Sequence, residues 1–107
     1  MVGASELPFR ILCRKYGAQL CYTPMMIASQ FAESDDYVWK EFQTTPFDRP
    51  LVCHFAANDP DDFAKAVRKA RPYCDAIDLN LGCPQVRAAL CERFIRQVYL
   101  LYFQYQD

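Results

Sequence analysis

The sequence predicts an α/β fold in which parallel strands alternate with helices. Composition supports a globular core, since 52% of the 107 residues are hydrophobic and 15% are aromatic. Short runs of strand-forming residues alternate with segments of helical periodicity. Their spacing matches that of strand–helix units, which favours a parallel sheet with covered faces.

The first expected element is a helix with Ser5 as its N-cap and Gly17 just past its end. Its apolar residues recur at helical spacing and predict a stripe that faces the core. This stripe comprises Phe9, Leu12, Cys13 and Tyr16. The basic residues fall on other faces and are interpreted as a solvated surface rather than an RNA-binding patch. They are Arg10, Arg14 and Lys15.

A short strand is expected at residues 19–23, where Pro24 stops the pattern. The stretch from 27 to 46 is less distinct, but an acidic cluster predicts a short helix that runs through Trp39 and Phe42. The cluster consists of Glu33, Asp35 and Asp36.

A second strand at residues 50–55 leads into the clearest helix of the sequence. Asn58 or Asp59 can cap this helix, and Pro60 suits its first turn because the N–H that proline lacks would be unpaired there. Its apolar stripe comprises Phe63, Ala66, Val67 and Ala70. A third strand follows at 74–79, and residues 86–107 are expected to form a divergent helical tail.

Charge and cysteine content exclude several classes of protein. A net charge of −1 lacks the basic excess of a free-standing nucleic-acid binder. The six cysteines have no Cys-x-x-Cys spacing and His54 is the single histidine, so we predict reduced cysteines and no metal site. The apolar run 98–103 is too short to span a membrane, and no targeting segment is visible, so we expect a soluble cytoplasmic or nuclear protein.

The loop at residues 80–85 is the main candidate for chemistry, because α/β barrels place catalytic groups after their strands. Gly82 permits an unusual backbone angle and Pro84 stiffens the exit, so Cys83 would lie on a constrained turn. A thiol with an ordinary pKa of about 8.5 is mostly protonated near neutrality and can donate a proton. The alternative interpretation of Cys83 is a buried, inert cysteine.

Residues 75–85, with the sequence DAIDLNLGCPQ, resemble the signature of tRNA dihydrouridine synthases, in particular the eukaryotic branch that acts on the tRNA D-loop. Three further stretches resemble the same family in the same order, at residues 1–10, 20–25 and 50–60. The Gly-Cys-Pro triplet alone would be weak evidence, but the ordered matches across residues 1–85 are strong.

The resemblance implies a partial TIM (β/α)8 barrel of about three to four βα units. It also implies FMN as cofactor, NADPH as reductant and tRNA as the partner whose D-loop uridine is reduced to dihydrouridine. Hydride would pass from the flavin to C6 of the base, and Cys83 would donate a proton to C5.

The resemblance also assigns cofactor contacts. Met1 and Gly3 match a loop that contacts the flavin, and Asn80 matches a residue beside flavin and uracil. His54 stands where many relatives carry glutamine, and it can donate one hydrogen bond to the flavin, with its tautomer open. Simpler interpretations remain: Met1 as an initiator, Asn80 as a cap, and His54 as a partner of a backbone group.

The sequence also departs from the family. A complete barrel needs about 250 residues, and residues 86–107 do not match the expected loop and helix. We therefore expect a fragment or isoform that is inactive alone. The alternatives are another FMN-barrel oxidoreductase that acts on a small pyrimidine, and a non-catalytic fragment.

Overall fold

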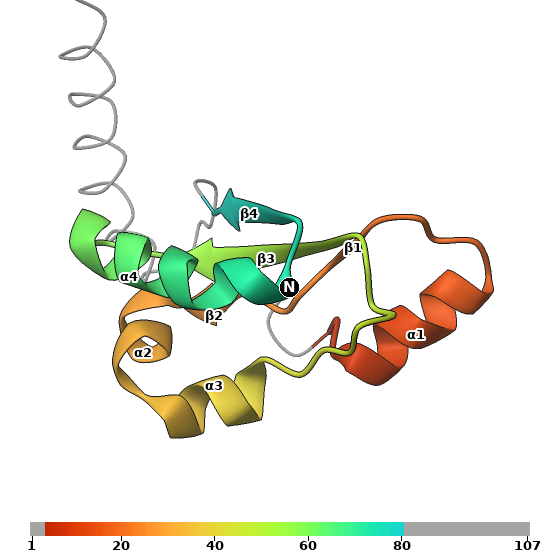
Figure 1. The fold of residues 1–107 in the computed structure, drawn as a ribbon, viewed down its shortest axis with the longest axis horizontal. Helices are drawn as coiled ribbons and strands as arrows, with labels where there is room; N and C mark the ends of the chain where they lie inside the picture. Colours follow the sequence, from red (N-terminus) through yellow and green to blue (C-terminus); the bar gives the residue numbers. More distant parts are fainter. Residues whose placement is uncertain (1–3, 81–107) are drawn as a thin grey trace, which may run out of the picture.

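The computed structural model describes residues 4–80, where strands and helices alternate as predicted (Figure 1). The helices are α1 (Leu7–Lys15), α2 (Ala28–Glu33), α3 (Asp35–Glu41) and α4 (Pro60–Ala70), which continues into the 3-10 helix η1 (Arg71–Tyr73). The strands are β1 (Cys21–Tyr22), β2 (Met26–Ile27), β3 (Leu51–Ala56) and β4 (Ala76–Leu79). The predicted tail at 86–107 lies outside the described residues.

The strands form a parallel sheet with β3 at its centre. Val52 pairs with Tyr22 of β1 and with Ala76 of β4, so these two strands lie on opposite edges of β3. Phe55 pairs in the same way with β2 and β4, so β2 shares the edge that β1 occupies. Among residues 4–80 the sheet is not closed. The α/β prediction is confirmed, and the barrel stays a prediction.

Strands β1 and β2 are two parts of one bulged strand. Positions 21 and 26 pair with positions 51 and 55, so this strand has one residue more than the facing part of β3. The predicted strand at residues 19–23 is therefore confirmed in a shorter form, and Pro24 lies within the bulge.

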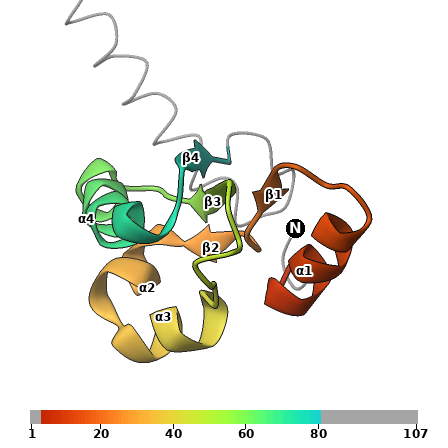
Figure 2. The ribbon, with the colours of Figure 1, turned by 45° about the vertical axis from the view of Figure 1, so that its right-hand side comes forward.

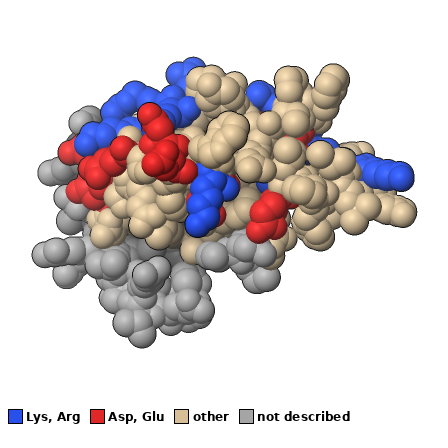
Figure 3. Space-filling view, turned by 90° about the horizontal axis from the view of Figure 1, so that it is seen from below, with Lys and Arg blue, Asp and Glu red and all other residues tan. Residues whose placement is uncertain are grey.

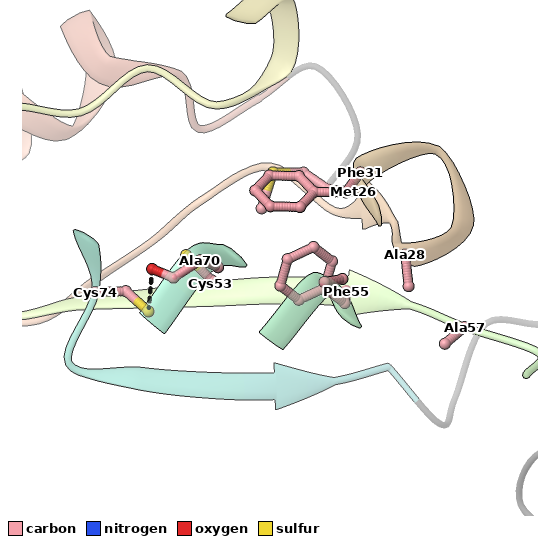
Figure 4. Packing of buried hydrophobic residues seen from close by; sticks show 9 residues of the cluster. Met26, Ala28, Phe31, Cys53, Phe55, Ala57, Ala70 and Cys74 are labelled. Atoms are coloured by element: carbon pink, nitrogen blue, oxygen red, sulfur yellow. Dashed lines mark hydrogen bonds between the residues drawn. The ribbon is translucent and has the colours of Figure 1, made fainter. Parts of the chain in front are cut away.

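One face of the sheet packs against helices to form the core. Phe55 of β3 is fully buried there, and its ring meets that of Phe31 from α2 edge to face, with ring centroids 5.1 Å apart (Figure 4). Ala66 and Ala70 of α4 are also fully buried. Figure 2 shows α2 and α4 next to each other beside the strands. The described cysteines are free thiols, as predicted: Cys13, Cys21, Cys53 and Cys74.

Helix α4 confirms its predicted start and its apolar stripe. Asp59 is the N-cap, and its carboxylate accepts hydrogen bonds from the N–H groups of Asp61 and Asp62 at 2.9 and 3.0 Å. Near the other end, the Nζ of Lys69 donates to the Asp35 carboxylate at 2.6 Å. This ion pair ties α4 to the start of α3.

The predicted short helix at the acidic cluster is confirmed as α3, which begins at Asp35 and ends one residue before Phe42. Ser34 caps it, because its hydroxyl accepts a hydrogen bond from the N–H of Tyr37 at 3.1 Å. The sequence prediction did not include the preceding helix, α2. Ser34 has extended backbone angles and so separates the two helices.

The ends of α1 agree with the prediction only in part. Gly17 has a φ of +98°, and its N–H donates to the carbonyl of Arg14, while Ala18 donates to Cys13. This pair of bonds is a Schellman motif, so the predicted role of Gly17 is confirmed. The N-cap prediction was wrong, because the capping position is Glu6, without a side-chain bond.

The buried face of α1 was also predicted wrongly. Arg10 is only 2% exposed, whereas Phe9, Leu12 and Tyr16 are 53%, 52% and 81% exposed. Of the predicted solvated residues, Arg10 is buried and Arg14 half-buried, while Lys15 is exposed as predicted. Much of the predicted apolar stripe points out. The sequence pattern identified an amphipathic helix but not the side that packs.

A buried aspartate explains this orientation. Arg10 donates to Asp48 Oδ2 at 2.7 and 2.9 Å through two nitrogens, and Arg14 donates to Oδ1 at 3.0 Å. Burial acts to raise the pKa of Asp48, but the hydrogen bonds and charges of both arginines outweigh it and hold the pKa below its ordinary value. The ion pairs attach α1 to the loop before β3.

Candidate functional site

The face of the sheet opposite the core carries the candidate site. His54 of β3 and its register partner Asp78 of β4 lie on this face, because strand alternation sends their neighbours Phe55 and Leu79 to the other side. Asn80 comes two residues after Asp78, so strand alternation places it on the same face. The cluster lies toward the carboxyl ends of the strands, the edge at which α/β sheets bind ligands.

The ring of His54 lies between residues of the two neighbouring strands. Its Nε2 atom is 3.6 Å from Asp78 Oδ2, and the ring of Tyr22 approaches it edge-on with centroids 6.5 Å apart. The side chain of His54 is 16% exposed and that of Asp78 is 45% exposed. The imidazole is therefore largely shielded while the carboxylate reaches solvent.

The bulge between β1 and β2 holds the backbone of His54. The His54 N–H donates to Oγ1 of Thr23 at 3.0 Å, and this hydroxyl donates to the carbonyl of Pro24 at 2.9 Å. Thr23 is fully buried. Its hydroxyl supplies an acceptor where the bulge interrupts the regular ladder of backbone bonds.

The protonation state of His54 follows from its surroundings. Burial lowers the pKa of His54 below its ordinary value, because the imidazolium form would lose hydration. The negative charge of Asp78 acts to raise this pKa but does not outweigh burial. His54 is therefore neutral at physiological pH, with one N–H donor and one acceptor nitrogen.

Asn80 links β4 to the opposite edge of the sheet. Its backbone N–H donates to the carbonyl of Phe55 at 2.8 Å, and its Nδ2 donates to Sδ of Met25 at 3.0 Å. A thioether sulfur is a weak acceptor. A ligand carbonyl would be a stronger acceptor for this amide, so Asn80 can bind a carbonyl group at this position.

The structure thus places two of the predicted site residues on the same side of the sheet, His54 in β3 and Asn80 directly after β4. Met1, Gly3 and Cys83 lie outside the described residues.

Sequence reasoning missed three members of the cluster, Thr23, Met25 and Asp78. The sequence did contain a signal for Asp78. This charged residue interrupts an apolar strand, and it lies two residues before Asn80, which places both on one face of the strand. The part of the chain that the structure describes contains no group of three or more His, Cys, Asp or Glu side chains that could hold a metal ion. Nor does it contain a helix long and apolar enough to cross a membrane.

Parallel strands with helices on one face and polar groups toward their carboxyl ends define an α/β unit of the kind that binds ligands in barrel enzymes. The family model described as "Dihydrouridine synthase (Dus)" matches residues 1–92 of the chain. The chain belongs to the dihydrouridine synthase family.

Individual relatives agree with this assignment. The chain is 55% identical over 87 residues to a tRNA-dihydrouridine(16/17) synthase of Schizosaccharomyces pombe, and the matched region covers 79% of this chain and 22% of the relative. It is 47% identical over 94 residues to a human tRNA-dihydrouridine(20a/20b) synthase-like protein, and the matched region covers 88% of this chain and 29% of the relative. Both names include NAD(P). The chain therefore spans less than a third of either relative.

Proposed function

We propose that this chain is the N-terminal part of a flavin-dependent enzyme that reduces uridine to dihydrouridine in tRNA. FMN is the proposed cofactor, NADPH the reductant and a D-loop uridine the target. The observation that carries the proposal is the cluster of His54 and Asn80 toward the carboxyl ends of β3 and β4, in a chain of the dihydrouridine synthase family. The relatives' names, which specify tRNA and NAD(P), support the substrate and the reductant.

The described residues fit the pyrimidine edge of a flavin, which presents carbonyl acceptors and an imide N–H. The Asn80 amide, now bonded to a thioether, can donate to a carbonyl. The neutral imidazole of His54 can form one hydrogen bond with the same edge. When bound, FMN would supply the hydride that adds to C6 of the uracil.

Three residues outside the described part complete the proposed site. Cys83 would donate the proton that C5 of the base takes up, which is a role for a neutral acid. Met1 and Gly3 would contribute to the loop that contacts the flavin. Residues 1–85 would then form the barrel portion and 86–107 a separate helical tail, although the family match continues to residue 92.

The surface charge suggests that tRNA affinity comes mainly from other parts of a complete enzyme. Basic and acidic side chains lie interspersed on the face seen in Figure 3, and the net charge of the chain is −1. Binding of a phosphate backbone needs a basic surface. We therefore propose that the chain alone is inactive. We also propose that the complete enzyme acts in the cytoplasm or nucleus.

A segment exchange tests the proposed function. Residues 1–85 replace the matching segment of the Schizosaccharomyces pombe synthase, and the chimera is incubated with NADPH and unmodified tRNA. We expect dihydrouridine to form, because the exchanged segments are similar in sequence. Cys83→Ala in the chimera should lower the rate about 10²- to 10⁴-fold with flavin still bound.

Two controls accompany this exchange. Cys13→Ala removes a thiol on α1, away from the candidate site, and should leave turnover unchanged. The isolated 107-residue chain, given FMN, NADPH and tRNA, should form no dihydrouridine. A chimera that folds and binds flavin but makes no dihydrouridine would contradict the proposed function.

A further inference from the structure

The contact between His54 and Asp78 bears on which imidazole nitrogen carries the proton. The two residues are register partners on adjacent strands, and the nitrogen that faces the carboxylate is Nε2, at 3.6 Å from Oδ2. An ionised carboxylate only accepts hydrogen bonds. A neutral imidazole has one N–H, and placing it on Nε2 gives the carboxylate a donor, whereas placing it on Nδ1 turns a lone pair toward a negative charge.

Residues of the other neighbouring strand border His54 as well. Thr23 holds the backbone of His54 from the edge that carries β1 and β2, and the Tyr22 ring borders the imidazole from the same edge. Asp78 approaches from β4. Among the described residues, Tyr22 and Asp78 are therefore the titratable groups that contact the imidazole from its two neighbouring strands.

We propose that Asp78 is a positioning residue that holds His54 in the Nε2-protonated tautomer and leaves Nδ1 as a hydrogen-bond acceptor. This inference rests on the proposed function for the identity of the ligand, which is the flavin, and it specifies the contact as an imide N–H that donates to Nδ1. A side-chain amide can either donate or accept, whereas His54 paired with Asp78 only accepts from the ligand.

The tautomer can be measured directly, because His54 is the single histidine of the chain. ¹⁵N NMR of the labelled 107-residue chain distinguishes a protonated ring nitrogen from an unprotonated one. We expect Nε2 to carry the proton above the pKa of His54. A proton on Nδ1 in the unaltered chain overturns the proposal, and this result needs no variant.

Two variants of Asp78 and one control separate positioning from general structure. Asp78→Leu removes the acceptor and should increase the population of the Nδ1-protonated tautomer. Asp78→Asn removes the charge that raises the pKa of His54, so the NMR titration should shift to lower pH. Asp36→Asn, on the exposed surface of α3, should change neither measurement. If the Asp78 variants retain the chemical-shift dispersion of the fold and change neither measurement, the proposal is wrong.

The ligand contact is tested in the chimera with FMN and with N3-methyl FMN, which lacks the imide N–H. The chimera with Asp78 should prefer FMN by about three- to tenfold, the worth of one hydrogen bond. Asp78→Leu should reduce that preference. If the chimera and its Asp78→Leu variant prefer FMN over N3-methyl FMN to the same extent, the proposed ligand contact is wrong. The proposed function fails separately, through loss of dihydrouridine formation, and the NMR measurements require neither flavin nor tRNA.

Discussion

Helices α1 and α4 have similar amphipathic sequences but opposite modes of packing. Helix α4 buries Ala66 and Ala70 against α2 and β3. Helix α1 exposes Phe9 and Leu12 and buries Arg10 instead. An apolar stripe therefore identifies a helix, while the side that is buried depends on the partners that the rest of the chain supplies.

The two helices are consequently held by different forces. The attachment of α4 rests on apolar burial and aromatic contacts around Phe55, which are non-directional. The attachment of α1 rests on ion pairs with the fully buried carboxylate of Asp48. The strength of these ion pairs depends on their geometry and on the ionisation of Asp48. Substitutions and pH should therefore affect the two regions differently.

The largest contrast is expected between two phenylalanine substitutions. Phe55→Ala removes a fully buried ring and should lower the free energy of unfolding by about 3–5 kcal/mol. Phe9→Ala removes a ring that is 53% exposed and should change it by no more than about 0.5 kcal/mol. Urea denaturation measures both. Equal losses would mean that the α1 stripe is covered after all.

Removal of Asp48 should destabilise the α1 region to a similar or slightly smaller extent. Asp48→Ala leaves Arg10 buried without its carboxylate, which costs about 3–5 kcal/mol for a buried pair. The double variant Arg10→Met, Asp48→Leu should lose less, because it leaves no charge at the buried position of Arg10. A double variant less stable than Asp48→Ala would show that the ion pair itself is strongly favourable.

The same contact predicts a pH dependence. The pKa of Asp48 lies below its ordinary value of 3.8, so the unfolded chain binds a proton more readily than the folded one. The stabilisation is therefore complete above pH 3.8 and is lost as pH falls through the lower, folded-state pKa. Unfolding curves measured between neutral and acid pH should show this loss. The loss should be smaller in Asp48→Asn, where the lowered pKa values of Asp35 and Asp75 still contribute. An undiminished loss in that variant would assign it to other carboxylates.

The smallest expected difference concerns the helix starts. Asp59→Ala removes a side chain that accepts two N–H groups of α4 and should cost about 1 kcal/mol. Glu6→Ala at the start of α1 removes no capping bond and should have a smaller effect on the free energy of unfolding. The difference between these two values measures the cap of α4, and equal values would contradict it.

The parts of the fold that depend on neighbouring residues could be predicted from the sequence. The start of α4 follows from Asp59 and the proline after it, and the end of α1 follows from the positive φ that Gly17 adopts. A strand was predicted at residues 50–55, close to the observed range Leu51–Ala56 of β3. The α/β class followed from how these local elements alternate.

The contacts between residues far apart in the chain could not be predicted in this way. Arg10 and Asp48 belong to segments with no local relation, so neither spacing nor propensity could predict their ion pairs or the inverted packing of α1. The pairing of His54 with Asp78 likewise depends on the register between β3 and β4, and Thr23 reaches His54 only through the bulge. Register is set by side-chain packing across the whole sheet, and shifting it by one residue would move these groups to the opposite face.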